Sequence, residues 1–179
     1  MENPWKTLKI NAKYENPWIR LEEHDILNPA GNPGIYGKVH FKNKALGIIP
    51  VDLEMHTWLV GQYRYTLDEY SWEIPMGGGP IGLDILESAK RELKEETGLI
   101  AAKWTEIMRI HTSNSVTDEE GFVFLAEDLV QEEPEFEETE VLQIKRIPFQ
   151  EALNWVMEGK ITDGISIAGI LKAAKILGL

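Results

Sequence analysis

Hydrophobic and polar positions change their period several times along the chain, and each change predicts an element. Short runs of alternating or continuous apolar residues predict strands at 18–25, 35–41, 45–50, 57–63, 104–111, 121–125 and 141–147. Residues 28–34 read NPAGNPG, a density of turn residues that predicts a loop. Helices are predicted at 84–97, at 149–158 between Pro148 and Gly159, and at 165–177, where apolar residues recur at helical spacing.

The order of these elements predicts the fold class. Strands, a helix, more strands and then helices indicate an α/β fold in which a mixed sheet lies between helices. The chain has 179 residues, which suffices for one well-buried core and is short for two. Neither repeats nor a low-complexity linker interrupt it, so residues 1–179 are predicted to form a single domain.

Charge and composition narrow the range of partners. With 30 acids against 18 bases the net charge is −12, which disfavours nucleic acid and anionic membranes as partners. Residues 127–140 hold eight acids and no base, so this segment carries a net charge of −8 and the rest of the chain −4. An anionic substrate therefore needs metal ions or local arginines to bind. Zero cysteines exclude disulfides and thiolate chemistry and fit a cytoplasmic protein. Neither a signal peptide nor a membrane-spanning run is expected, and the four histidines lie too far apart for a local metal-ligand motif.

Three glutamates carry the strongest sign of chemistry. Glu92, Glu95 and Glu96 are three and four residues apart, which places their side chains on one face of a helix. Carboxylates so close repel one another, and a hard cation such as Mg²⁺ converts that repulsion into binding. A solvated acidic face is the alternative. A glycine-rich turn before the helix, Asp84 as its N-cap and Thr97-Gly98 as its stop favour a site.

The segment 77–99, GGGPIGLDILESAKRELKEETGL, resembles the signature of the Nudix hydrolases. The matching positions are Gly77, Arg91, Glu92, Leu93, Glu95, Glu96, Gly98 and Leu99. One position departs, since Leu83 stands where the family has a glutamate that orients the arginine. Glu87, four residues before Arg91, is expected to pair with it instead.

Two other nucleotide-binding motifs are rejected in the same segment. Gly77-x-Gly79-x-x-Gly82 fits a dinucleotide-binding pattern, but Pro75 and Pro80 break the strand and loop that the pattern requires. A phosphate-binding GxxxxGK[ST] is absent, because Leu83 follows Gly82 where a lysine is needed.

Further segments resemble one branch of the family, the ADP-ribose and nucleoside-diphosphate-sugar pyrophosphatases. They are QYRY at 62–65 with WEIP at 72–75, the acidic ETE at 138–140, and KITDG at 160–164. The resemblance implies a Nudix-type α/β/α sandwich and Mg²⁺-dependent hydrolysis of ADP-ribose or another nucleoside diphosphate sugar. The products would be a nucleoside monophosphate and a sugar phosphate. It also implies a homodimer to which the N-terminal strands, about 1–45, contribute.

The resemblance also implies roles for individual residues. Metal ligands would be the carbonyl of Met76 with Glu92, Glu95, Glu96 and Glu140, binding Mg²⁺ or Mn²⁺ as a substitute. Catalytic roles would fall to Glu140, Glu96 and Arg91, and substrate contacts to Arg64, Glu73, Gly77, Gly78 and Glu119. Two alternatives stay open from the residues: Arg64 could pair with an acid instead of pyrophosphate, and Glu138 is the rival of Glu140 because residues two apart in an extended segment share a face.

Two other functions compete with this prediction. One is a housecleaning hydrolase of nucleoside triphosphates or dinucleoside polyphosphates, which the QYRY and ETE segments disfavour. The other is a non-catalytic nucleotide-binding regulator, and a pure binder has no need of three metal carboxylates. The preferred sugar and base are left open.

Overall fold

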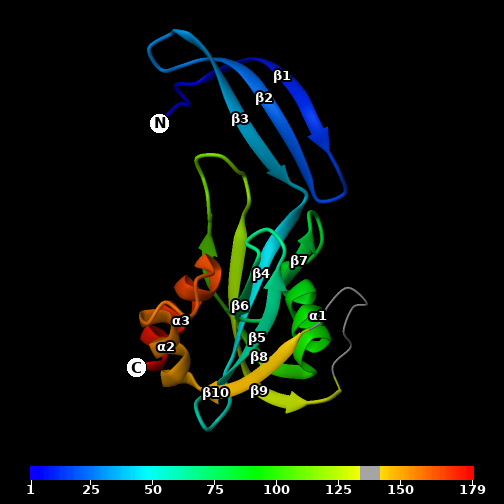
Figure 1. Ribbon diagram of the computed structural model, residues 1–179, viewed down its shortest axis with the longest axis vertical. Helices are drawn as coiled ribbons and strands as arrows, with labels where there is room; N and C mark the ends of the chain where they lie inside the picture. Colours follow the sequence, from blue (N-terminus) through cyan, green and yellow to red (C-terminus); the bar gives the residue numbers. More distant parts are fainter. Residues whose placement is uncertain (134–141) are drawn as a thin grey trace.

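The computed structural model describes residues 1–133 and 142–179, which form three sheets and three helices (Figure 1). The N-terminal sheet is antiparallel, in the order β1 (Lys6–Glu15), β2 (Ile19–Leu27), β3 (Pro33–Phe41). A mixed sheet has the order β7 (Met76–Pro80), β4 (Asn43–Pro50), β9 (Gly121–Gln131), β8 (Leu99–Ile110), with β4 and β9 parallel. The third sheet is antiparallel, in the order β10 (Gln143–Pro148), β5 (His56–Arg64), β6 (Glu69–Glu73). The helices are α1 (Ile85–Thr97), α2 (Phe149–Met157) and α3 (Gly164–Leu177).

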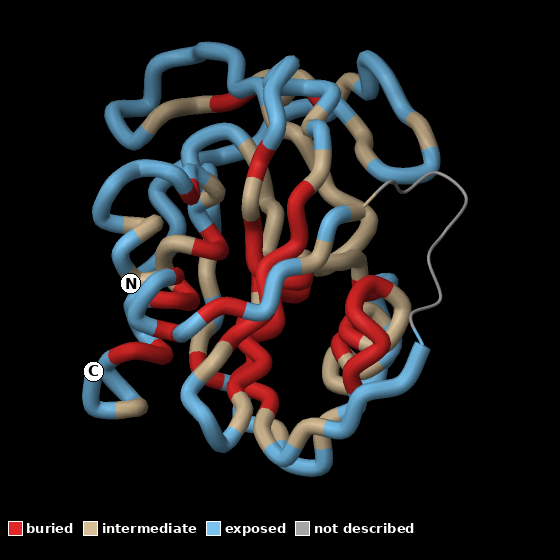
Figure 2. Tube along the Cα trace, turned by 60° about the horizontal axis from the view of Figure 1, so that its bottom comes forward, coloured by how far each residue is buried: buried red, intermediate tan, exposed pale blue. Residues whose placement is uncertain are grey.

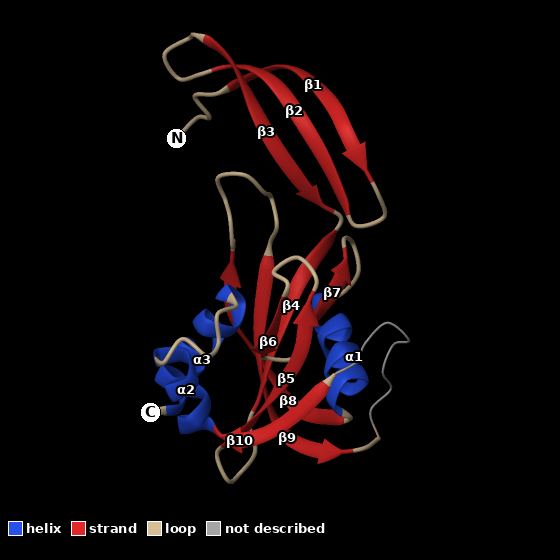
Figure 3. Cartoon of the chain, in the orientation of Figure 1, coloured by secondary structure: helices blue, strands red, loops and turns tan. Residues whose placement is uncertain are grey.

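Helices cover both sides of the central strands, with α1 on one side and α2 and α3 on the other (Figure 3). Strand β4 shows why, because its alternate residues point to opposite faces. Leu46 and Ile48 belong to the core beneath α1, whereas Ile49 belongs to the core beneath α3. All three are fully buried, and the buried segments run through the middle of the molecule (Figure 2). The predicted α/β/α sandwich with a mixed sheet is therefore confirmed.

The ends of α1 follow the predicted local chemistry. The carboxylate of Asp84 accepts hydrogen bonds from the backbone amides of Leu86 at 2.8 Å and Glu87 at 3.2 Å, which caps the first turn. Gly98 ends the helix in the left-handed region with φ of 72°. Among the described residues, no helix combines the length and the apolar character that crossing a membrane requires.

Three strands were missed by the sequence pattern: β1, β6 and β7. The prediction of a glycine-rich turn before α1 is wrong for 76–80, which are strand β7 and pair with β4 through Gly77 and Leu46. Glycines carry no hydrophobic alternation, so only pairing with a neighbouring strand reveals them as a strand. The acidic segment is also partly strand, since β9 continues to Gln131 through Glu127 and Asp128.

The N-terminal sheet extends away from the sandwich and joins it where β3 leads into β4 (Figure 1). A second connection comes from the 111–120 loop between β8 and β9. The amide of Val39 donates to the carbonyl of Val116 at 2.9 Å, and the hydroxyl of Tyr36 donates to the carbonyl of Ser115 at 2.8 Å. The sheet is thus attached to the sandwich at two places.

Candidate active site

Strand β7 and helix α1 approach closely because the strand consists mainly of glycine. A Cβ built on Gly77 would collide with the carboxylate carbon of Glu92. A Cβ on Gly79 would lie 2.9 Å from Cδ1 of Leu46 and 3.5 Å from Cβ of Ser88. Glycine at 77 and 79 therefore lets the helix present its side chains directly to the strand.

Two of the three predicted carboxylates, Glu92 and Glu96, meet the strand along this contact. Glu96 is 2% exposed, and its Oε2 accepts a hydrogen bond from the backbone amide of Met76 at 3.0 Å. Glu92 lies beside Gly77. Glu95, one turn from Arg91, accepts a hydrogen bond from that guanidinium at 2.8 Å. The structure thus brings Glu92 and Glu96 to the start of β7, with Glu95 joined to them through Arg91.

Arg91 is held by two of these acids. Its guanidinium lies 2.5 Å from Oε1 of Glu92 and 2.8 Å from Oε2 of Glu95. Partial burial disfavours the charged guanidinium, but the negative charges of Glu92 and Glu95 outweigh this and raise the pKa of Arg91. Arg91 thereby offsets much of the repulsion between the carboxylates.

The expected pairing of Glu87 with Arg91 is wrong. Glu87 forms an ion pair with Lys90 at 2.7 Å, on the solvent side of the helix. Leu83, at the position of the usual family glutamate, is 63% exposed in the turn before α1. Arg91 is oriented by Glu92 and Glu95, the acids that follow it on the same helix. A glutamate at position 83, or Glu87 in its place, is therefore not needed to orient it.

The donors gathered here suit a hard divalent cation. Glu92, Glu95 and Glu96 offer carboxylate oxygens, and Met76 offers a backbone carbonyl, which are the oxygen ligands that Mg²⁺ prefers. A side chain at Gly77 would occupy the space beside the Glu92 carboxylate. The residues present therefore fit a divalent cation.

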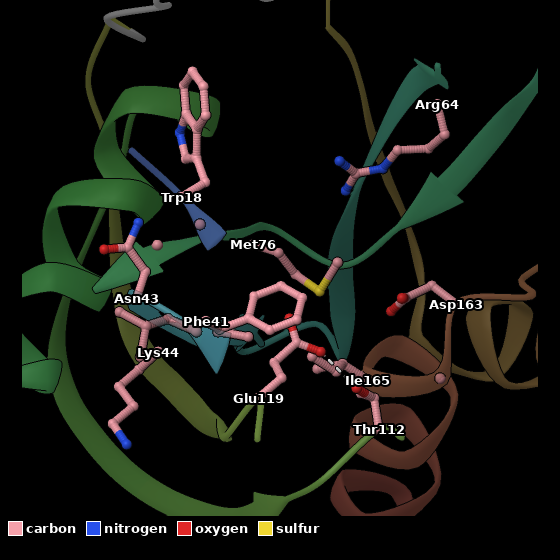
Figure 4. Close-up of a pocket in the computed structure, with 15 residues that line it drawn as sticks. Trp18, Phe41, Asn43, Lys44, Arg64, Met76, Thr112, Glu119, Asp163 and Ile165 are labelled. Atoms are coloured by element: carbon pink, nitrogen blue, oxygen red, sulfur yellow. Dashed lines mark hydrogen bonds between the residues drawn. The ribbon is translucent and has the colours of Figure 1, made fainter. Parts of the chain in front are cut away.

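A cavity of about 690 Å³ opens in front of β7 (Figure 4). It brings together five of the residues predicted for the site: Arg64, Met76, Gly77, Gly78 and Glu119. An adjoining cavity of about 470 Å³ is lined by Glu73 and also by Arg64 and Glu119. The predicted side chains thus come from β5, β6, β7 and the 111–120 loop to one connected space.

Arg64 is fixed in this space by a buried acid. Its Nε donates to Oε1 of Glu73 at 2.8 Å, and Nη2 donates to the other carboxylate oxygen. Glu73 is 3% exposed. Its hydrogen bond raises the pKa of Arg64, so the cation is permanent. The predicted substrate contact at Glu73 is therefore a carboxylate whose two oxygens are both bonded to Arg64.

Glu119 reaches the cavities from the loop before β9. Its Oε2 accepts a hydrogen bond from the Thr112 hydroxyl at 2.5 Å, and the side chain lines both cavities. Figure 4 shows it below Met76, with Phe41 beside it.

Sequence reasoning missed several lining residues. Trp18, Phe41 and Asn43 come from the N-terminal sheet and the start of β4, and Asp163 from the cap of α3. Trp18 lies across the cavity from Arg64 and Asp163 in Figure 4. Only Asp163 had a local signal, because Asp-Gly before an apolar helix is typical of an N-cap. Glu138 and Glu140 lie outside the described residues.

A second polar cluster lies at the other end of β5, where Asp52, Glu54 and His56 place ligand atoms within 4.8 Å of one another. Arg146 already spans it, with Nη2 2.6 Å from both Asp52 and Glu54. Neither Asp52 nor its partners line the cavity at β7. This cluster is an ion-pair network between β10 and the turn that joins β4 to β5.

Comparison with known proteins agrees with this geometry. Residues 42–164 match the NUDIX domain family, and residues 5–39 match the nucleoside diphosphate sugar hydrolase N-terminal domain. The chain is 34% identical to an ADP-ribose pyrophosphatase of Mycobacterium tuberculosis, covering 95% of this chain and 83% of that protein. It is 35% identical to an ADP-ribose pyrophosphatase of Bacillus subtilis, covering 88% and 86%. A crystal structure of an ADP compounds hydrolase shares the fold, with a TM-score of 0.87 at 21% identity over 97% of this chain and 94% of that one.

The close contact at Gly77 predicts a separation of activity from stability. Gly77→Ala should displace the Glu92 carboxylate, because the new Cβ would occupy its place and a glutamate side chain moves easily. We expect hydrolysis to fall about 100-fold, the usual effect of a displacement near 1 Å at a reacting centre, with Tm lowered by only a few degrees. Gly37→Ala, at a position where a Cβ has open space, is the matched control. Full activity in Gly77→Ala would contradict the placement of Glu92.

Proposed function

The chain belongs to the NUDIX domain family, and from this premise we propose that it hydrolyses the pyrophosphate bond of ADP-ribose or another nucleoside diphosphate sugar. The observation that supports this best is strand β7: Glu92 and Glu96 of α1 contact it at Gly77 and Met76, and the same two strand residues line the cavity that also holds the fixed cation of Arg64. The named activity of the mycobacterial and Bacillus relatives supports the same substrate class. The products are a nucleoside monophosphate and a sugar phosphate.

We propose that Glu92, Glu95, Glu96 and the Met76 carbonyl hold Mg²⁺, for which Mn²⁺ can substitute. When bound, the cation offsets the negative charge of the pyrophosphate and favours attack by water. Arg91 keeps Glu92 and Glu95 in place through the ion pairs described above. The buried contact of Glu96 with the Met76 amide keeps helix and strand in register.

The substrate contacts follow from the cavity walls. Arg64 donates its remaining N–H groups to pyrophosphate oxygens, while Glu73 fixes the orientation of the guanidinium by accepting hydrogen bonds from Nε and Nη2. Gly77 and Gly78 let the substrate approach the backbone of β7, because neither carries a side chain. Glu119 accepts hydrogen bonds from the nucleoside part of the substrate.

We further propose that Glu140 takes the proton of the attacking water, with Glu138 as its nearest rival. The support is positional, since Glu140 lies eight residues before Pro148, the residue directly before α2. The helix acids and Arg91 already bind one another or the strand, so the proton acceptor must come from another segment.

The competing functions are less well supported. Hydrolysis of nucleoside triphosphates or dinucleoside polyphosphates does not account for the match of 5–39 to the N-terminal domain of nucleoside diphosphate sugar hydrolases. A non-catalytic regulator does not account for two helix carboxylates held against β7, Glu96 by the Met76 amide and Glu92 beside Gly77, where the strand has no side chain.

Hydrolysis should require a divalent cation. With Mg²⁺ and ADP-ribose we expect AMP and ribose 5-phosphate, measured by phosphate release with a coupled phosphatase. Excess chelator should abolish the reaction, and added Mg²⁺ should restore it. A panel of ADP-glucose, UDP-glucose, GDP-mannose and nucleoside triphosphates ranks the substrates. Turnover undiminished by chelator, or a clear preference for triphosphates, would contradict the proposal.

The role of the acidic segment can be tested by charge removal at constant size. Glu140→Gln should lower kcat by about 10²- to 10⁴-fold, the range of a positioned acid or base, with little change in KM. Glu138→Gln is the control and should cost much less. The reverse result moves the role to Glu138, and two active variants would show that neither acid takes part.

We propose a homodimer formed through the N-terminal strands. The support is a group of exposed apolar side chains on the N-terminal sheet: Leu8 and Ile10 of β1 are 54% and 55% exposed, and Tyr36 of β3, which shares a face with Ile10 through its pairing with His24, is 40% exposed. Large exposed apolar side chains gathered on one small sheet are typical of an association surface. β1 also forms an edge of its sheet.

Light scattering at micromolar concentration should give a dimer. The double variant Leu8→Glu with Ile10→Glu should give a monomer, because four desolvated carboxylates cannot be buried across a twofold interface. Leu53→Glu, on a turn residue 96% exposed, should remain dimeric. A monomeric wild-type chain would remove this proposal.

A further inference from the structure

Three consecutive acids, Asp118, Glu119 and Glu120, end the loop before β9, and they have different surroundings. Only Glu119 lines the cavities. The two flanking acids are turned away from it and bind cations of the neighbouring strands. The middle acid therefore faces the cavities, whereas the acids on both sides of it hold the loop to its neighbours.

Asp118 is bound to β3 by both oxygens. Oδ2 lies 2.6 Å from Nδ1 of His40 and 2.7 Å from Nζ of Lys38, and Oδ1 accepts a hydrogen bond from the amide of Phe41 at 2.9 Å. Its own amide donates to the carbonyl of Val39 at 3.1 Å. Four consecutive residues of β3 thus contact this one aspartate.

Glu120 fixes the loop from the other side. Its carboxylate binds Lys44 and Arg109, and its carbonyl accepts a hydrogen bond from the amide of Ala45 at 3.0 Å. The backbone on both sides of Glu119 is therefore attached, to β3 through Asp118 and to β4 and β8 through Glu120.

The contact of Asp118 reaches the cavity wall directly. Phe41, whose amide it binds, lines both cavities. The next amide along, that of Lys42, donates to the carbonyl of Trp18 at 2.9 Å, and Trp18 lines the larger cavity. One carboxylate thus connects three wall residues, which are Glu119 beside it, Phe41 through its amide, and Trp18 one hydrogen bond further.

We propose that Asp118 is a positioning residue that sets the outer wall of the substrate cavity by joining the loop of Glu119 to the strand of Phe41. This rests on the proposed function, in which Glu119 contacts the nucleoside part of the substrate. The joint is ionic at neutral pH: burial favours the protonated acid, but Lys38, His40 and the Phe41 amide lower the pKa of Asp118 to about 2. It acts on binding rather than chemistry, because the metal-binding acids lie on α1 and do not contact it.

Asp118→Asn tests this, since it keeps the size and removes the charge. We expect KM for ADP-ribose to rise about tenfold, the effect of losing one charge-assisted contact, with kcat within about twofold of the wild type. The Kd of AMP, measured by calorimetry without divalent cation, should rise by a similar factor. Glu127→Gln, which removes the Lys103 ion pair on β8 and β9, is the control and should change neither value.

A merely structural role would lower Tm without separating KM from kcat. A folded Asp118→Asn enzyme with KM and Kd within about twofold of the wild type overturns the proposal, and so does a loss confined to kcat. If this variant does not fold, His40→Ala and Lys38→Met each remove one partner, and a KM unchanged in both overturns it equally. If the wild type binds AMP but does not hydrolyse ADP-ribose, the proposed function fails while the Kd comparison still decides the role of Asp118.

Discussion

The contact between β7 and α1 is the constraint on which the site depends. Helix α1 presents Glu92 and Glu96 to a strand of glycines, and the amide of Met76 donates a hydrogen bond to the buried carboxylate of Glu96. A side chain at Gly77 would take the place of the Glu92 carboxylate, and one at Gly79 would crowd Leu46. The proposed metal site needs carboxylate oxygens of α1 close to the backbone of β7. Glycine permits this close approach because it carries no side chain.

The site also has to attract an anion to a protein of net charge −12. It does so with local cations whose direction is fixed by acids. Arg64 lies on Glu73, and Arg91 lies between Glu92 and Glu95. Because each guanidinium keeps donors beyond those pairs, the acids orient its positive charge without using every donor, and of the two arginines Arg64 lines the cavity.

The N-terminal sheet participates in the site instead of serving only as an attachment. It supplies Trp18 and Phe41 to the cavity wall, and it is joined to the 111–120 loop by Asp118 and by backbone hydrogen bonds at Val39. The same sheet carries the exposed apolar residues proposed to form a dimer. Dimer formation and substrate binding would therefore both depend on the position of this sheet. A shift of β3 in the dimer would also move the cavity wall.

The sequence by itself determined the elements with local signals. Asp84 and Gly98 bounded α1, alternating apolar runs predicted β4 and β5, and the spacing of Glu92, Glu95 and Glu96 predicted one acidic helix face, because caps and periodicity depend only on near neighbours. Tertiary structure decided the rest. Glycine strand β7 is recognisable only beside β4, and Glu87 proved to bind Lys90. Trp18 and Phe41 reached the cavity, and Asp118 reached the amide of Phe41, only because segments far apart in the chain meet. Such contacts depend on which strands meet, and no single stretch of sequence specifies that.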